Sequence, residues 1–147
     1  MAQFVSSFER ITFGERILLG LNFVALIVRY WFHYEATLFL EIFAFALTFL
    51  YLPFGFYSIG KPGKEYTYTT GIILGLIYAL GIISLLISAA NIGSYRYPLI
   101  ADFFILLIAV LYLVFKMQSD KYPEVFINAQ FIRVGYIILC GLVILLK

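Results

Sequence analysis

The chain has one cysteine and one histidine among its 147 residues. The single Cys140 excludes an intramolecular disulfide and a metal site built from several cysteines, and its apolar neighbourhood predicts a small core residue. The single His33 excludes a two-histidine haem site and a multi-histidine metal site, and any Ser-His-Asp triad would need this same residue. We therefore expect no metal and no cofactor, and an enzyme is the least supported class.

Charged residues are also scarce. Asp, Glu, Lys and Arg make up 12% of the chain against 64% hydrophobic residues, and the mean hydropathy is +1.02. This composition predicts an integral membrane protein. The net charge of +2 is scattered and no basic run or RNA-binding motif occurs, which excludes nucleic acid as a partner. Glu9 and Glu15 interrupt the region where a signal peptide would be apolar, so we expect the first span to be retained.

Five apolar segments are long enough, or nearly so, to cross a bilayer. They cover residues 11–32, 37–58, 69–92, 98–115 and 124–146. Both faces of each segment are apolar, which indicates helices rather than the alternating strands of a membrane barrel. The predicted fold class is an all-α integral membrane protein with about five transmembrane helices. The first and fifth segments are the weakest spans because charges interrupt them, and these charges must reach the interface or pair.

The basic residues orient these segments. One side has Arg10, Arg16, Lys61, Lys64, Lys116, Lys121 and Arg133, and the other has Arg29, Arg96 and Lys147. Because Lys and Arg are enriched on the cytoplasmic side of membrane proteins, the N-terminus is predicted inside and the C-terminus outside. Termini on opposite sides of the membrane require an odd number of spans, which agrees with five.

Glycine pairs recur about every sixty residues, at Gly14 and Gly20, Gly75 and Gly81, and Gly135 and Gly141. The same offset aligns Glu41 with Asp102. We interpret the unit as a two-helix hairpin within a single transmembrane domain, residues 1–147, with repeats at 11–58 and 72–115 and a half repeat at 124–147. Because each unit has an even number of helices, the copies are parallel, as in one class of transporter repeats. The alternative is a duplicated hairpin that serves only packing.

Glycines six residues apart point about 240° apart on a helix, so each odd-numbered segment offers small notches to two neighbours. The third segment adds small residues to both of its stripes, and we expect it at the centre of the bundle. The alternative is that one stripe forms an oligomer contact. The candidate helix-packing residues are Gly14, Gly20, Gly71, Gly75, Ala79, Gly81, Gly135 and Gly141.

Two carboxylates, Glu41 and Asp102, lie inside the second and fourth segments, where each needs a partner, a water path or a proton. Arg29 is placed to meet Glu41 across the first hairpin, and Arg96 lies six residues before Asp102. Paired carboxylates would neutralise the outer helix ends, and we favour this structural interpretation. The alternative is that Glu41 and Asp102 face a shared wet cavity and bind a cation or carry protons.

The sequence therefore predicts a small, non-enzymatic, multi-pass protein of the inner (cytoplasmic) membrane of a bacterium. Its expected role is that of a structural or accessory subunit of a larger membrane complex, because it has neither a soluble domain nor a recognisable set of catalytic groups. The expected partners are membrane lipids and other membrane-protein subunits or further copies of the chain. The alternative is a small oligomeric transporter or channel that couples to cations or protons through its intramembrane carboxylates.

Overall fold

Five α-helices account for most of the residues described by the computed structural model. The backbone is described for residues 2–32, 37–59, 65–90, 96–117 and 124–146, and side chains for 13–32, 37–52, 71–90, 97–112, 114–115 and 128–146. The helices are α1 (Ala2–Trp31), α2 (Thr37–Ile59), α3 (Glu65–Ala89), α4 (Arg96–Met117) and α5 (Glu124–Leu145). The all-helical prediction is confirmed, with one helix for each apolar segment.

The largest boundary difference is at α1, which begins at Ala2 instead of residue 11. A helix continues as long as its backbone hydrogen bonds do, and polar residues such as Ser6 and Glu9 are compatible with it. Hydropathy marks only the apolar part of a helix. The sequence analysis therefore located this helix correctly and underestimated its length.

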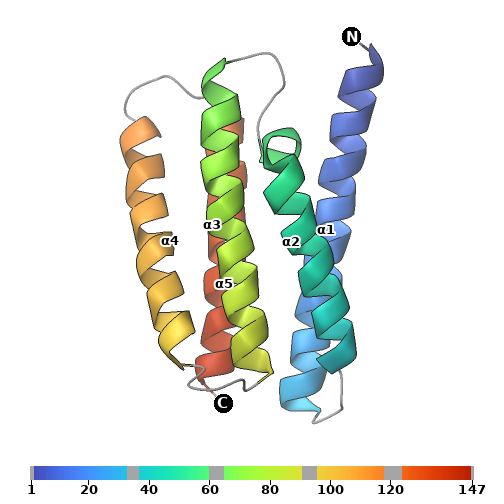
Figure 1. Ribbon diagram of the computed structural model, residues 1–147, viewed down its shortest axis with the longest axis vertical. Helices are drawn as coiled ribbons and strands as arrows, with labels where there is room; N and C mark the ends of the chain where they lie inside the picture. Colours follow the sequence, from blue (N-terminus) through green and yellow to red (C-terminus); the bar gives the residue numbers. More distant parts are fainter. Residues whose placement is uncertain (1, 33–36, 60–64, 91–95, 118–123, 147) are drawn as a thin grey trace.

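Consecutive helices run up and down the bundle, so α1, α3 and α5 share one direction and α2 and α4 the other (Figure 1). The two ends of the chain lie at opposite ends of the bundle. The central helix is α3, which packs against α2, α4 and α5. This arrangement confirms the predicted central position of the third segment.

Two helical stretches with described side chains are long and apolar enough to cross a membrane, Gly71–Ala89 of α3 and Asn128–Leu145 of α5. Two further apolar stretches, Thr37–Leu52 and Tyr97–Tyr112, are shorter. The buried core helix of a soluble protein would meet the same length and composition criteria. The surface of the bundle is therefore the more informative feature.

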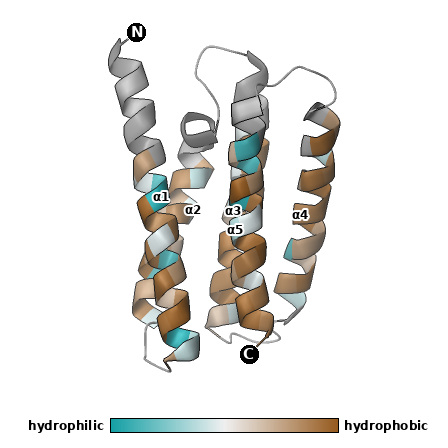
Figure 2. Cartoon of the chain, turned by 180° about the vertical axis from the view of Figure 1, so that it is seen from behind, coloured by the Kyte–Doolittle hydropathy of each residue, from teal (hydrophilic) through white to brown (hydrophobic). Residues whose placement is uncertain are grey.

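Most of the exposed side chains that the structure describes are apolar, and the exceptions include Arg16 of α1 and Asn128 of α5. Residues of high hydropathy occur along all five helices (Figure 2). Phe45 and Phe49 of α2 and Phe104 and Ile108 of α4 are all more than half exposed, and large apolar residues are exposed on every helix. The buried polar and charged residues are Glu15, Asn22, Thr48, Ser88, Asp102, Gln130 and Arg133. The rest of the interior is apolar, so the bundle differs from a water-soluble helical bundle in having buried charges together with many exposed large apolar side chains.

The repeated glycines do not share one environment. A Cβ atom added to Gly81 would lie 3.1 Å from Cδ1 of Ile137, and one added to Gly141 would lie 2.9 Å from Cζ of Phe103. The same addition at Gly14, Gly20 or Gly135 would meet no heavy atom within 4 Å. Because residues six apart face different directions, Gly141 contacts a neighbouring helix while Gly135 of the same pair faces open space.

Gly71, Gly75 and Ala79 are buried in α3, together with Gly81. Close helix packing is thus centred on α3 and on the contact between α4 and α5. At Gly14, Gly20 and Gly135 a Cβ atom would point into open space, so the helix-packing role expected for them is not seen among the described residues of the bundle.

These two environments predict opposite effects of the same substitution in α5. Gly141→Ala forces the Phe103 ring to move, and overpacking of this kind costs about 1–3 kcal/mol, more than the gain of up to about 1 kcal/mol in helix propensity. We expect a lower melting temperature in detergent for Gly141→Ala, and an unchanged or higher one for Gly135→Ala, which is the matched control. Equal melting temperatures for the two variants would contradict the packing described here.

Candidate functional site

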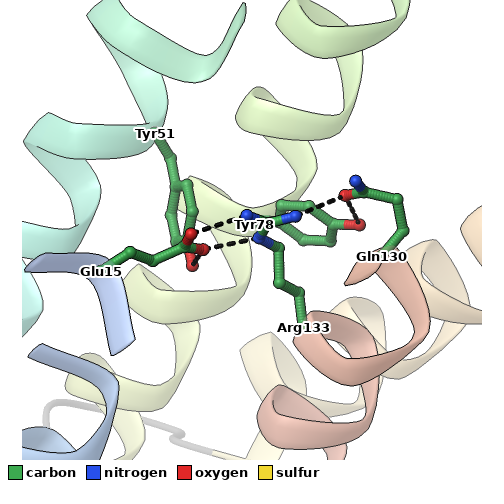
Figure 3. Close-up of polar contacts among 5 residues, drawn as sticks. All are labelled: Glu15, Tyr51, Tyr78, Gln130 and Arg133. Carbon is green, nitrogen blue, oxygen red and sulfur yellow. Dashed lines mark hydrogen bonds and ion pairs between the residues drawn. The ribbon is translucent and has the colours of Figure 1, made fainter. Parts of the chain in front are cut away.

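Five polar side chains from four helices meet in the interior, and we call them the buried cluster (Figure 3). Its members are Glu15 of α1, Tyr51 of α2, Tyr78 of α3, and Gln130 and Arg133 of α5. All five are buried, and Tyr78 and Gln130 have an exposed fraction of 0%. The cluster joins helices that are far apart in the sequence.

At its centre is an ion pair between Arg133 and Glu15. Nε of Arg133 donates to Oε1 of Glu15 at 2.5 Å, and Nη2 donates to Oε2 at 2.6 Å. This two-pronged geometry matches the planar guanidinium to the planar carboxylate, and it is the stronger form of a charge-assisted hydrogen bond. The two residues are 118 positions apart in the chain, so the pair links α1 directly to α5.

The tyrosines complete the hydrogen bonding around this pair. The Tyr51 hydroxyl donates to Oε1 of Glu15 at 2.8 Å. The Tyr78 hydroxyl donates to Oε1 of Gln130 at 3.1 Å, and Nη1 of Arg133 donates to the same oxygen at 3.2 Å. The two tyrosine rings meet edge to face with centroids 5.6 Å apart. A buried charge pair is stable only when its remaining hydrogen-bonding groups are satisfied, and these residues satisfy them.

A second polar contact joins the same two helices further along α5. The Tyr136 hydroxyl lies 2.9 Å from the backbone oxygen of Leu19 and 3.1 Å from Oδ1 of Asn22. The Phe23 ring packs against the Tyr136 ring with centroids 6.3 Å apart. α1 and α5 make few other contacts with each other. The Glu15–Arg133 ion pair and the Tyr136 hydroxyl therefore supply much of the interaction between these two helices.

The residues expected to form outer charge pairs are arranged differently. Arg29 donates to Oγ1 of Thr37, so it joins the end of α1 to the start of α2. Among the described residues it forms no ion pair with Glu41, which is half-buried on α2. The Arg96 side chain lies outside the described residues, so the expected pair with Asp102 stays a prediction.

Glu41 and Asp102 therefore differ in environment although they occupy equivalent positions of the proposed repeat. Asp102 is 3% exposed, and its Oδ1 has no hydrogen-bond partner among the described residues. Rotation of each helix about its axis decides whether a side chain faces the interior, and a sequence offset does not specify that rotation. The structure does not bring Arg29, Glu41 and Asp102 together into one site.

The sequence analysis did not identify the buried cluster. It treated Arg133 as a cation at the inner side and Glu15 as an interruption of the first span. The available signal was that opposite charges occur inside two parallel apolar segments, near the same end of each. Tyr51, Tyr78 and Gln130 have no comparable signal, because single tyrosines and amides are common near the ends of membrane helices.

A binding site would also need a group of metal ligands or a cavity large enough for a ligand, and the described residues offer little of either. No group of three or more His, Cys, Asp or Glu side chains in this part of the chain is placed to hold a metal ion. A cavity of about 10 Å³ lies between α1, α2 and α3. It is lined by Asn22, Leu26, Leu40, Ala44, Ile82, Leu85, Leu86 and Ala89. This volume is close to that of one water molecule, and Asn22 is its only polar side chain.

Comparison of the chain with protein-family models, curated proteins and solved structures finds no match.

The ion pair generates a prediction about stability. Glu15→Gln or Arg133→Gln alone leaves one buried charge without its partner and is expected to lower the free energy of unfolding by about 3–5 kcal/mol. The double variant loses less than the sum of the two single variants, because it removes both charges. Thermal unfolding in detergent measures all three, and Arg16→Gln, at the exposed neighbouring position, is the control. Additive losses, or losses no larger than that of the control, would contradict the pairing.

Proposed function

We propose that this chain is a small polytopic membrane protein, with all five helices crossing the bilayer, that acts as a structural or accessory subunit of a larger membrane complex. The observation that carries the membrane assignment is the distribution of polar and apolar side chains in the bundle. Large apolar side chains are exposed on every helix, and the interior contains an ion pair and several polar side chains. Lipid is the solvent in which this distribution is favourable.

The outer face of α4 makes the argument concrete. Ile100, Phe104, Leu107, Ile108 and Leu111 are all about half exposed or more. Exposure to water would cost roughly 25 cal/mol for each Å² of this apolar surface. A monomeric soluble protein rarely exposes such a large continuous apolar patch, which marks contact with lipid or with another protein.

The helix lengths support five spans. The 23 residues of α2 and the 22 of α4 give lengths of about 33–35 Å at 1.5 Å per residue, against a hydrocarbon thickness of about 30 Å. The first and fifth segments were the weakest spans because of their charges. Pairing of Glu15 with Arg133 inside the bundle removes that objection, and the exposed Arg16 nearby is long enough to reach the interface.

We further propose that the N-terminus is inside and the C-terminus outside. The ends of the chain lie at opposite ends of the bundle, as an odd number of spans requires (Figure 1). Arg133 pairs internally and no longer counts as an interfacial cation. The other basic residues still favour the same side, with Arg10, Arg16, Lys61, Lys64, Lys116 and Lys121 against Arg29, Arg96 and Lys147.

The subunit role is supported by how the polar groups are used. Glu15, Tyr51, Tyr78 and Arg133 bond to other members of the buried cluster, and so hold four helices together. The wide apolar faces of α2 and α4 remain available to neighbouring transmembrane helices as well as to lipid. We propose a non-catalytic role, with two and a half hairpin repeats as the packing unit.

One observation favours the transporter alternative, namely the buried carboxylate of Asp102, which has no hydrogen-bond partner among the described residues at Oδ1. Intramembrane ionisable groups often mark the paths of ions or protons. The two functions differ in the composition of the native particle, since a transporter of this size is expected to assemble from copies of itself.

The proposed topology predicts which loops react with reagents outside the cell. In a Cys140→Ala background, Ser94→Cys is expected to react with a membrane-impermeant maleimide in intact cells. Lys61→Cys is expected to react only after permeabilisation, because its loop faces the cytoplasm. The unsubstituted Cys140→Ala chain is the control. The opposite labelling pattern would overturn the orientation, and extraction of the protein by alkaline carbonate would overturn membrane insertion.

The proposed role predicts the composition of the complex. Purification from the native membrane in mild detergent, followed by mass measurement of the intact particle, is expected to yield this chain with foreign subunits in fixed stoichiometry. Phe104→Ala on α4 and Phe45→Ala on α2 test which exposed face binds them, while the melting temperature of the isolated chain serves as control. A homogeneous particle of identical chains would contradict the accessory role and favour the transporter.

A further inference from the structure

Asp102 is the one described residue with a buried side-chain oxygen that has no hydrogen-bond partner, and that oxygen is Oδ1. The residue belongs to α4 and is 3% exposed. Buried polar groups in proteins are nearly always hydrogen-bonded, so each exception needs a physical explanation.

This oxygen lies close to the backbone of Gly81 in α3. Oδ1 lies 3.3 Å from the point that a Cβ atom of Gly81 would occupy, and Cδ1 of Ile137 in α5 lies 3.1 Å from the same point. The missing side chain of Gly81 therefore leaves room for the carboxylate beside α3.

The titratable groups of the adjoining helices have partners elsewhere. Tyr78 of α3 donates to Gln130, Arg133 of α5 pairs with Glu15, and Tyr136 of α5 bonds to α1. Cys140 of α5 is a buried thiol, and Tyr97 and Tyr112 of α4 are exposed. The remaining charged residues of these helices have side chains outside the described residues. These are Glu65, Arg96, Lys116 and Glu124.

These surroundings restrict what the carboxylate can bind. An ionised carboxylate without a partner is strongly disfavoured in an apolar interior. A metal cation would require several further ligands, and no group of three or more His, Cys, Asp or Glu side chains in the described part of the chain is placed to supply them. A proton requires only the carboxylate itself.

We propose that Asp102 is a proton-binding site, and that its side chain is a neutral carboxylic acid in the folded bundle at neutral pH. Gly81 provides the space for the protonated group, and the burial of that group excludes most of the surrounding water. Release of the proton would create a charge between three packed helices. The packing of α3, α4 and α5 therefore depends on whether the proton is bound. This inference rests on burial at Asp102 and is independent of the subunit role.

The chain has only two aspartates, Asp102 and Asp120, which makes the test specific. The protein carrying Asp120→Asn is labelled with ¹³C at the aspartate carboxyl group and reconstituted into phosphatidylcholine liposomes. Infrared spectroscopy at neutral pH is expected to show the isotope-shifted carbonyl band of one protonated carboxyl group. The band is expected to disappear only at alkaline pH, and to be absent when Asp102→Asn is added.

A second measurement does not depend on spectroscopy. Asp102→Asn places a neutral group of the same shape in a site that we propose is already neutral, so the melting temperature should remain that of the unsubstituted protein. Glu41→Gln, at the half-buried carboxylate of α2, is the matched control.

Absence of the protonated band at neutral pH would overturn the proposal. A marked loss of stability in Asp102→Asn would also overturn it, because such a loss would show that the negative charge itself contributes to folding. If the proton-binding proposal failed but the native particle contained foreign subunits, the accessory role would stand. Proton binding at Asp102 and the accessory role are therefore tested separately.

Discussion

The ion pair between Glu15 and Arg133 joins the first helix of the chain to the last, and it is the contact on which the arrangement of the bundle depends. Consecutive helices need only short connections to pack side by side, but α1 and α5 have no such connection and make few other contacts. Two charges in an apolar interior have no alternative partner of comparable strength, so the pair specifies which faces of the two helices meet. Tyr51 and Tyr78 then connect α2 and α3 to the same point.

Glu15 and Asp102 are two buried carboxylates of the same bundle, and the free-energy cost of burying a negative charge is met differently at each. Glu15 accepts hydrogen bonds from a guanidinium and a phenol. Asp102 has no hydrogen-bond partner at Oδ1 among the described residues, and in our proposal a bound proton removes its charge. The first solution links α1 to α2 and α5. The second makes part of the bundle responsive to protons, which is a property that a subunit or a transporter can use.

The apolar exterior of the bundle also restricts which interactions can hold the helices together. Large apolar side chains are exposed on every helix, and several polar and charged side chains are buried. In lipid there is little hydrophobic driving force between helices, so close packing and hydrogen bonds must supply specificity. The contacts of Gly81 with Ile137 and of Gly141 with Phe103 provide the close packing. The buried cluster provides the hydrogen bonds. This division of roles is consistent with the proposed membrane location.

The sequence by itself determined the number of helices, their approximate bounds and the central place of α3, because apolar length and small residues are local properties that the chain displays directly. It did not specify the buried cluster, the burial of Asp102 or the different environments of paired glycines. Only the tertiary structure decided these, because each depends on the rotation of a helix about its own axis. That rotation is set by contacts between residues as distant as Glu15 and Arg133, 118 positions apart, and isolated charges do not give any segment a continuous polar face. When a helix has no amphipathic face, its local sequence does not predict which side will face inward.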